Sequence, residues 1–210
     1  MLAATATFFQ KIASQYTRQL VSNPLRTNIA TGGVLAFTSD LICQTVVEKV
    51  ESVAWKRTAA IAIFGMYYNG GICTLVYPLY SRVLPHWFAS SPLRQGVGST
   101  LVDNFIHSPI FYVPSFYMST AILQGIDFNT ALTTLKRGYI TTMLSTWLIW
   151  IPLQTFNFSV VPTKLRVLVL SVGCFFYTIQ LDHLQQNFAN REEETVHENV
   201  PDFRNASSET

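Results

Sequence analysis

Long stretches without Asp, Glu, Lys or Arg dominate the pattern of the chain. Three are uninterrupted, Thr58–Ser81, Asn104–Ile126 and Gly138–Thr163, and they have 24, 23 and 26 residues. About 20 residues of α-helix cross the hydrocarbon core of a bilayer, so each stretch is long enough to span it. Asn28–Val47 contains a single acidic residue, and Val167–Leu181 is free of charge but has only 15 residues. The latter can span a bilayer only if flanking residues extend its helix.

The polar residues inside these stretches are mainly Thr, Ser, Gly and Asn. A helix on the surface of a soluble bundle would carry charges on its outer face, whereas small and hydroxylated residues are typical of helices packed together in lipid. Continuous apolar runs also argue against alternating strands of a membrane barrel. We therefore predict an all-α, polytopic membrane helix bundle with four to five hydrophobic spans; burial in a soluble bundle is the alternative. The predicted spans are 28–48, 57–80, 97–123, 138–157 and 165–184.

The two ends differ from the bundle predicted at 28–184. Residues 1–27 contain three basic residues and no acid, which predicts a basic amphipathic segment on a membrane surface and also resembles a mitochondrial targeting segment. Asn23-Pro24 breaks this pattern before the first span. Residues 185–210 are acidic and contain few large apolar residues, so we expect a short disordered tail there.

Composition supports a membrane protein. Charged residues are 12% and hydrophobic residues 49% of the chain, and the mean hydropathy is +0.27. The net charge of +2 divides into +7 over residues 1–181 and −5 over residues 182–210. The low fraction of charged residues and the high fraction of hydrophobic ones exclude a disordered chain and a charge-rich nucleic-acid binder. The expected partners are the lipid bilayer, small solutes or ions and a second copy of the chain, with no direct contact to nucleic acid.

Asp40 lies in the middle of the first predicted span. On a helix it shares a face with Gly33, Phe37 and Gln44. A lone carboxylate that faces lipid costs about 2.5–3.5 kcal/mol, so this face must point into the bundle or toward water. Asp40 and Gln44 are therefore candidate pore-lining or gating residues. The alternative is a structural role, in which Asp40 pairs with one of the arginines Arg57, Arg137 or Arg166.

The third predicted span carries a second polar group. Asp103 and His107 are four residues apart and can pair on one helical face, which makes them further candidate pore or gating residues. Pro109 and Pro114 follow, and in an α-helix they leave the carbonyls of Phe105 and Ile110 without their helical donors. A membrane helix tolerates this only where a cavity, water or a neighbouring side chain supplies a donor. We expect this span to be kinked and partly hydrated.

The fourth predicted span ends in a run of aromatic, amide and proline residues. Pro152 frees the Leu148 carbonyl, and the amides of Gln154 and Asn157 can satisfy such groups across helices. Trp at the end of a span also fits the interfacial belt. The residues singled out in this run are Trp147, Trp150, Pro152, Gln154, Asn157, Phe158, Val161, Pro162 and Arg166.

No enzyme is predicted. The chain contains no nucleophile motif, no metalloprotease motif and no phosphate-binding glycine loop. Cys43, Cys73 and Cys174 lie far apart, which favours buried small side chains over disulfides, with redox sensing as the alternative. The four histidines show no ligand spacing, so neither a metal nor a cofactor is expected.

The closing run carries a resemblance to a known family. Trp150, Gln154, Asn157, Phe158, Val161, Pro162 and Arg166 match, in order and spacing, the signature of the Mpv-seventeen/peroxisomal-membrane-protein-two family (Sym-one-like members included). Weaker similarity extends over residues 16–182, through Gly33, Asp40 and Gln44, then Arg57, Gly65 and Gly70, then Asp103 and Pro109. Asp182 stands where the family usually has a serine, and Gly71 where it has a proline. The chain thus resembles a divergent member.

The resemblance implies a multi-pass protein of the mitochondrial inner membrane, with the peroxisomal membrane as the alternative. It also implies a weakly selective pore for small solutes that contributes to membrane homeostasis and metabolite balance. Two hypotheses therefore stand beside each other. In the first, the protein is such a pore, and in the second it is a non-conducting structural or assembly protein.

Overall fold

The computed structural model describes residues 2–83, 91–159 and 166–198, and these ranges form helices and short turns with no strand among them. This confirms the predicted all-α class. Three segments, labelled η, are π-helical, with hydrogen bonds that run over five residues instead of four. In chain order the elements are α1 (Leu2–Ser22), α2 (Pro24–Ile42), η1 (Cys43–Val47), α3 (Trp55–Phe64), η2 (Gly65–Ile72), α4 (Cys73–Val83), α5 (Pro92–Val102), η4 (Asp103–Tyr112), α6 (Val113–Gln124), α7 (Phe128–Ser159) and α8 (Arg166–Glu198).

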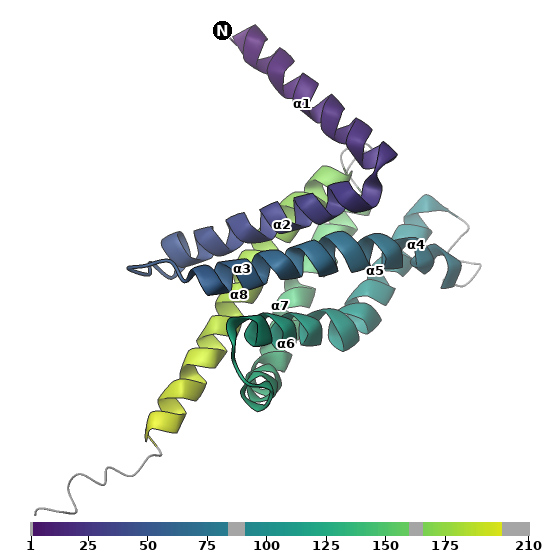
Figure 1. The fold of residues 1–210 in the computed structure, drawn as a ribbon. Helices are drawn as coiled ribbons and strands as arrows, with labels where there is room; N and C mark the ends of the chain where they lie inside the picture. The colour runs from purple at the N-terminus through teal and green to yellow at the C-terminus, as the bar shows by residue number, and fades with distance from the viewer. Residues whose placement is uncertain (1, 84–90, 160–165, 199–210) are drawn as a thin grey trace, which may run out of the picture.

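The elements join into five long rods, α2–η1, α3–η2–α4, α5–η4–α6, α7 and α8, and each contains one predicted span (Figure 1). By length and composition, two helical stretches of the described chain can cross a membrane, Pro24–Val47 and Trp55–Val76. The third predicted span lies in α5–η4–α6, and the last two lie in α7 and α8, which have 32 and 33 residues. The positions of the helices agree with the prediction.

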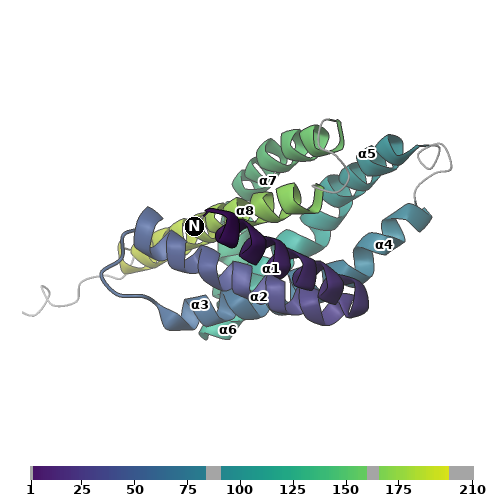
Figure 2. The same cartoon turned by 90° about the horizontal axis from the view of Figure 1, so that it is seen from above.

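The first helix stands apart from these rods. Figure 1 shows α1 rising away from the bundle at an elbow, where Asn23 separates it from α2. Pro24 occupies the first turn of α2, where its missing N–H costs nothing. Across the elbow the Tyr16 and Thr31 hydroxyls lie 3.2 Å apart within hydrogen-bonding distance. Seen from above, α1 crosses over α2 (Figure 2).

Glycines allow the first two rods to pack backbone against backbone. A Cβ placed on Gly32 would lie closer than 3.0 Å to the Gly65 carbonyl, and one on Gly65 would collide with Ala36. Small residues at helix contacts are how membrane helices approach closely enough for extensive van der Waals packing. These two glycines therefore fix the first hairpin.

An aromatic core fills the space between the second and third rods. The Phe64 ring stacks on Tyr68 with centroids 5.1 Å apart, and it meets Phe116 edge-on at 5.1 Å. Tyr117, fully buried, lies within hydrogen-bonding distance of Thr142 on α7, with 2.8 Å between the hydroxyl oxygens. Such offset and edge-to-face contacts stabilise aromatic pairs beyond their buried area.

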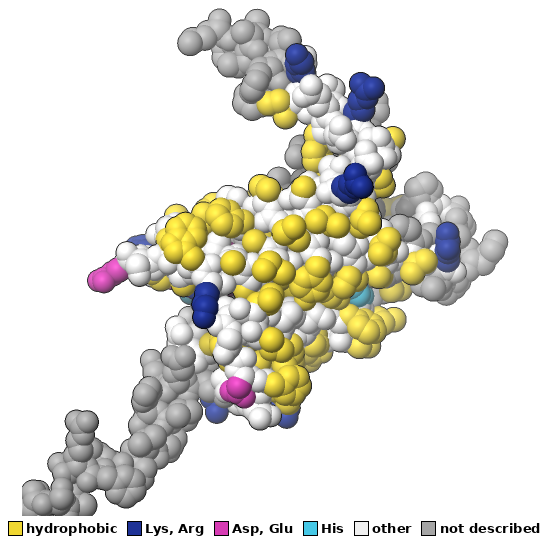
Figure 3. All heavy atoms as spheres, viewed as in Figure 1, with side chains coloured by type: hydrophobic (Ala, Val, Ile, Leu, Met, Phe, Trp, Pro, Cys, Tyr) yellow, Lys and Arg dark blue, Asp and Glu magenta, His cyan; other side chains and the backbone are white. Residues whose placement is uncertain are grey.

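The outside of the bundle is apolar over a wide face (Figure 3). Large hydrophobic side chains are exposed along every rod, which fits a surface that contacts lipid chains. The most exposed members include Val34, Leu75, Ile140, Leu144 and Leu148.

Helix α8 extends further than the sequence predicts. It continues to Glu198, through residues 185–198 that were expected to begin a disordered tail. The side chain of Gln185 is buried, and its Nε2 donates to Thr120 Oγ1 at 2.8 Å and to the Tyr117 carbonyl at 3.3 Å. This docking, followed by good helix formers such as Arg and Glu, keeps the chain helical. Residues 199–210 lie outside the described residues.

Candidate functional site

A cluster of charged side chains is buried where the first hairpin meets α8. It consists of Asp40, Glu48, Arg57 and Asp182 and is called the Arg57 cluster. Arg57 Nη1 lies 2.6 Å from Glu48 Oε2, its Nη2 lies 2.6 Å from Asp182 Oδ2, and its Nε lies 2.8 Å from Asp40 Oδ1. The first two contacts are hydrogen bonds; the third lacks hydrogen-bond geometry and acts through charge. The guanidinium of Arg57 on α3 thus joins carboxylates from α2, from the hairpin loop and from α8.

Gln44 holds this cluster in place. Its Nε2 donates to Asp40 Oδ2 at 2.7 Å and to Thr58 Oγ1 at 2.9 Å, and its Oε1 accepts the Ala54 N–H at 2.7 Å. The last contact ties η1 to the residue that precedes α3, so the turn between the rods is fixed by a side chain. Asp40 and Gln44 are both fully buried.

The structure therefore pairs Asp40 with Arg57 among the three arginines that the sequence left open. Arg137 is exposed on α7, and the side chain of Arg166 lies outside the described residues. Glu48 and Asp182 were not predicted as members of the site. An acid inside the predicted span 165–184 was the available signal for Asp182, since such residues need a partner.

A second polar group lies in the third rod, and we call it the His107 cluster. His107 Nδ1 lies 3.1 Å from Asp103 Oδ1, and its Nε2 lies 3.2 Å from the Tyr68 hydroxyl. The predicted Asp103–His107 pair is therefore present, and the structure adds Tyr68 from η2. His107 and Tyr68 are buried, whereas the Asp103 side chain is 17% exposed. The cluster runs from a partly exposed acid to a buried phenol.

Two prolines in this rod leave backbone carbonyls for α7 to satisfy. The sequence predicted free carbonyls at Phe105 and Ile110, but η4 bonds over five residues, as shown by the Val113 N–H that donates to the Ser108 carbonyl. In this register Pro109 and Pro114 deprive Asn104 and Pro109 of their donors, so the predicted positions were wrong by one residue.

Both carbonyls receive a side-chain donor. Trp147 Nε1 donates to the Asn104 carbonyl at 2.8 Å, and the Tyr139 hydroxyl donates to the Pro109 carbonyl at 2.9 Å. We expected a neighbouring side chain to donate to the free carbonyls of this span, and α7 supplies both donors. Unpaired carbonyls at membrane depth would be costly, so these two bonds support the π-helical segment.

The predicted closing run lies only partly within the described side chains. Gln154 Oε1 accepts from Asn104 Nδ2 at 3.4 Å, which confirms an amide contact across helices. Trp150 packs edge-on against Tyr177 with centroids 5.5 Å apart, and Pro152 is exposed inside α7. Pro162 and the side chains of Asn157, Phe158 and Arg166 lie outside the described residues.

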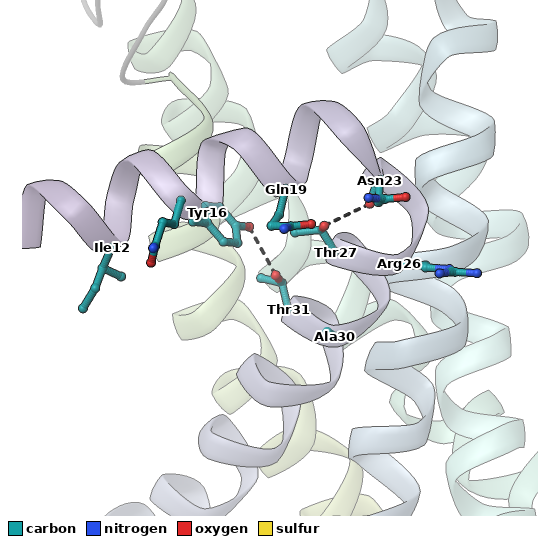
Figure 4. Close-up of a pocket in the computed structure, with 9 residues that line it drawn as sticks. Ile12, Tyr16, Gln19, Asn23, Arg26, Thr27, Ala30 and Thr31 are labelled. Carbon is teal, nitrogen blue, oxygen red and sulfur yellow. Dashed lines mark hydrogen bonds between the residues drawn. The ribbon is translucent and has the colours of Figure 1, made fainter.

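A groove of about 580 Å³ lies at the elbow between α1 and α2 (Figure 4). Its floor carries the Tyr16–Thr31 contact and a bond from Thr27 Oγ1 to the Asn23 carbonyl. The Tyr16–Thr31 contact joins α1 to α2 across the groove, so it helps to orient α1. The groove contains none of the candidate pore residues.

Asp127 is a charged residue that lies outside the predicted spans. It precedes α7 and its Oδ1 accepts the N–H of Asn129 at 2.8 Å and of Thr130 at 3.3 Å. Bonds from the Thr130 hydroxyl and from these amides lower the pKa of Asp127 below its ordinary value of 3.8. It is the N-cap of α7.

Comparison with known proteins places these features in a family. The sequence model of the Mpv17 / PMP22 family matches residues 121–182. Protein SYM1 of Mycosarcoma maydis is 30% identical over 167 residues, which cover 78% of this chain and 82% of that protein. Protein SYM1 of Debaryomyces hansenii is 26% identical over 200 residues, 91% of this chain and 95% of that protein.

A vertebrate relative is similar over much of its length. The mitochondrial inner membrane protein Mpv17 of Danio rerio is 24% identical over 159 residues, covering 75% of this chain and 87% of that protein. No solved structure gives a significant match. The chain belongs to the Mpv17 / PMP22 family of membrane proteins.

Proposed function

We propose that the protein is a weakly selective pore for small solutes in the mitochondrial inner membrane. The relative from Danio rerio is a mitochondrial inner membrane protein, which supports this location. The pore is supported chiefly by one observation, the line of hydrogen-bonding groups from Asp103 through His107 to Tyr68. An ionisable group inside a membrane helix is costly, and such groups mark ion or solute paths more often than other positions do.

Segment η4, which contains Asp103 and His107, has one exposed apolar side and one buried polar side. Phe105, Ile106 and Phe111 of η4 are 49%, 51% and 55% exposed, as lipid-facing residues would be, while His107 is 6% exposed. A π-helical segment widens the helix locally and occurs frequently at functional sites. We place the polar side of the conduction path along Asp103 and His107.

Asp40 has a different role in this proposal. It is fully buried against Arg57 and Gln44, so it stabilises the bundle and does not line the path. This differs from the hypothesis that Asp40, Gln44, Asp103 and His107 line one pore together. Neutralising Asp103 should change ion selectivity, whereas neutralising Asp40 should change stability.

Conductance across planar bilayers tests the proposal. Purified wild-type protein should give discrete events, and Asp103→Asn should lower the preference for cations. Asp127→Asn is the matched control, because it removes the same charge from an exposed turn and should leave selectivity unchanged. A folded protein that stays silent across voltages, or an Asp103→Asn variant with wild-type selectivity, would refute this assignment.

The same experiment addresses the second candidate, a non-conducting structural or assembly protein. The ion contact between Asp40 and Arg57 at 2.8 Å favours it, since that hypothesis expects an arginine partner for Asp40. Silence of a correctly folded wild-type protein would support this function, and isolation of the intact complex would then identify the subunits it contacts.

A further inference from the structure

Three potential metal ligands converge beside the Arg57 cluster. The ligand atoms of Cys43, Glu48 and His183 all lie within 4.8 Å of one another. Cys43 Sγ is 3.6 Å from Glu48 Oε1, and His183 Nδ1 is 3.4 Å from the same oxygen. We propose that these three side chains bind a divalent transition-metal ion, with zinc(II) as the best match.

The π-helical turn η1 brings the first two ligands together. Residues five apart on an α-helix point about 140° away from each other. In η1 the Glu48 N–H instead donates to the Cys43 carbonyl at 2.8 Å, so the turn is wider and both side chains reach the same side. The third ligand comes from α8, which passes this end of the hairpin. Glu48 and His183 lie 135 residues apart, so no local spacing in the sequence points to the site.

The two separations that involve Glu48 fit tetrahedral coordination. With Zn–S near 2.3 Å and Zn–N or Zn–O near 2.0–2.1 Å, tetrahedral angles place sulfur and oxygen about 3.5 Å apart and nitrogen and oxygen about 3.3 Å apart. The two separations in the structure, 3.6 and 3.4 Å, are close to these values. The His183 side chain is 37% exposed, so water can reach a fourth position.

The charge of the surroundings also favours a cation. Three carboxylates surround one guanidinium, which leaves an excess of two negative charges when all are ionised. Asp182 is fully buried, and its Oδ1 accepts no hydrogen bond within the described chain. On binding, the metal–sulfur bond forms as the Cys43 S–H proton leaves to solvent, so a divalent ion reduces the excess charge by one.

Neighbouring groups support the ligands. Arg57 Nη1 donates to Glu48 Oε2 at 2.6 Å and its Nη2 donates to Oε1 at 3.2 Å, so the guanidinium fixes the carboxylate while Oε1 keeps a second lone pair for the metal. Nη2 also lies 3.5 Å from Cys43 Sγ. The His183 ring has its other nitrogen 3.1 Å from the Asn187 amide. When Nδ1 binds the metal, Nε2 of His183 carries the ring proton. A flip of the Asn187 amide then places its Oδ1 where it accepts the hydrogen bond from Nε2.

Metal titration of untagged, full-length protein in lipid nanodiscs tests the proposal. After stripping with a chelator, the wild type should take up one zinc ion per chain, and cobalt(II) should give a thiolate-to-metal absorption band. Cys43→Ser should weaken zinc binding at least tenfold and abolish the band. Cys73→Ser, a matched change at another buried cysteine outside the site, should leave both unchanged.

Two results would overturn the site. The first is a wild-type protein that binds no zinc at micromolar concentration, and the second is a Cys43→Ser variant that binds as tightly as the wild type. If Cys43→Ser does not fold, the cobalt spectrum of the wild type decides, since a spectrum without a thiolate band excludes Cys43 as a ligand. His183→Asn should lower affinity while keeping the thiolate band.

Discussion

Replacing Tyr139 by Phe tests the π-helical register of the third rod. The change removes the Tyr139 hydroxyl, which donates to the Pro109 carbonyl at 2.9 Å. Hydrogen bonds between membrane helices contribute about 0.6 kcal/mol on average and up to about 1.7. Leaving a buried carbonyl without a donor costs about 1–3 kcal/mol. We therefore expect the free energy of unfolding to fall by about 1–2 kcal/mol.

Reversible unfolding of the protein in mixed micelles, driven by increasing SDS and followed by circular dichroism, measures this loss. It corresponds to a 5–30-fold change in the ratio of folded to unfolded protein. Tyr67→Phe is the matched control, because the Tyr67 hydroxyl donates at 2.7 Å to the Ser119 hydroxyl on an exposed surface and no backbone group depends on it. We expect its effect to stay within about 0.5 kcal/mol.

A second substitution distinguishes the register from a simple loss of packing. In the π-helical register, Pro114→Ala restores an N–H directed at the Pro109 carbonyl, so it should recover much of the stability lost in Tyr139→Phe. In an α-helical register that N–H would point to Ile110 and would not compensate. Additive effects of the two changes, with no recovery in the double variant, would refute the assignment.

Three further predictions concern other parts of the bundle. Arg57→Lys replaces the planar guanidinium that joins three carboxylates and should lower stability by about 3–5 kcal/mol in the same unfolding assay, whereas wild-type stability would contradict the buried network. Gly65→Val should separate the first two rods and cost about 1–3 kcal/mol, while Gly71→Ala, whose added Cβ meets its nearest atom at 3.6 Å, should be tolerated. Because the folded-state pKa of Asp127 is lowered, its cap is fully effective above pH 3.8 and is lost as the pH falls through the folded value. The hydrogen-exchange protection of the amides in the first turn of α7 should therefore decrease as the pH falls below the folded-state pKa of Asp127. Protection that does not change with pH would contradict the cap.

The helices were predictable because each rod has one strong constraint that is visible in the sequence. Runs without charge, such as Thr58–Ser81, must be buried in lipid or protein, and Asn23-Pro24 must interrupt a helix. The end of α8 was not predictable in this way. Its continuation depends on Gln185 binding to α6, a contact between residues 65 positions apart that no local composition reveals.

The clusters were predictable only within one helix. Asp103 and His107 are four residues apart, so helical spacing alone brings them together, as the structure confirms. Partners from other rods, such as Asp182 for Arg57, depend on how the helices pack. The register of η4 also depends on packing, because the donors that favour it come from α7 and cannot be inferred from the two prolines alone.

The separation of the predicted gating residues into two clusters decides how conduction must be tested. Asp40 contacts Arg57 inside the first hairpin, whereas Asp103 pairs with His107 in the third rod, where its side chain is partly exposed. A double variant of both acids would lose a structural ion contact and a candidate path residue together, so a loss of current would have two explanations. Single variants avoid this ambiguity. If Asp103→Asn alters selectivity at unchanged stability while Asp40→Asn lowers stability at unchanged selectivity, conduction and folding depend on different acids, and only Asp103 belongs to the path.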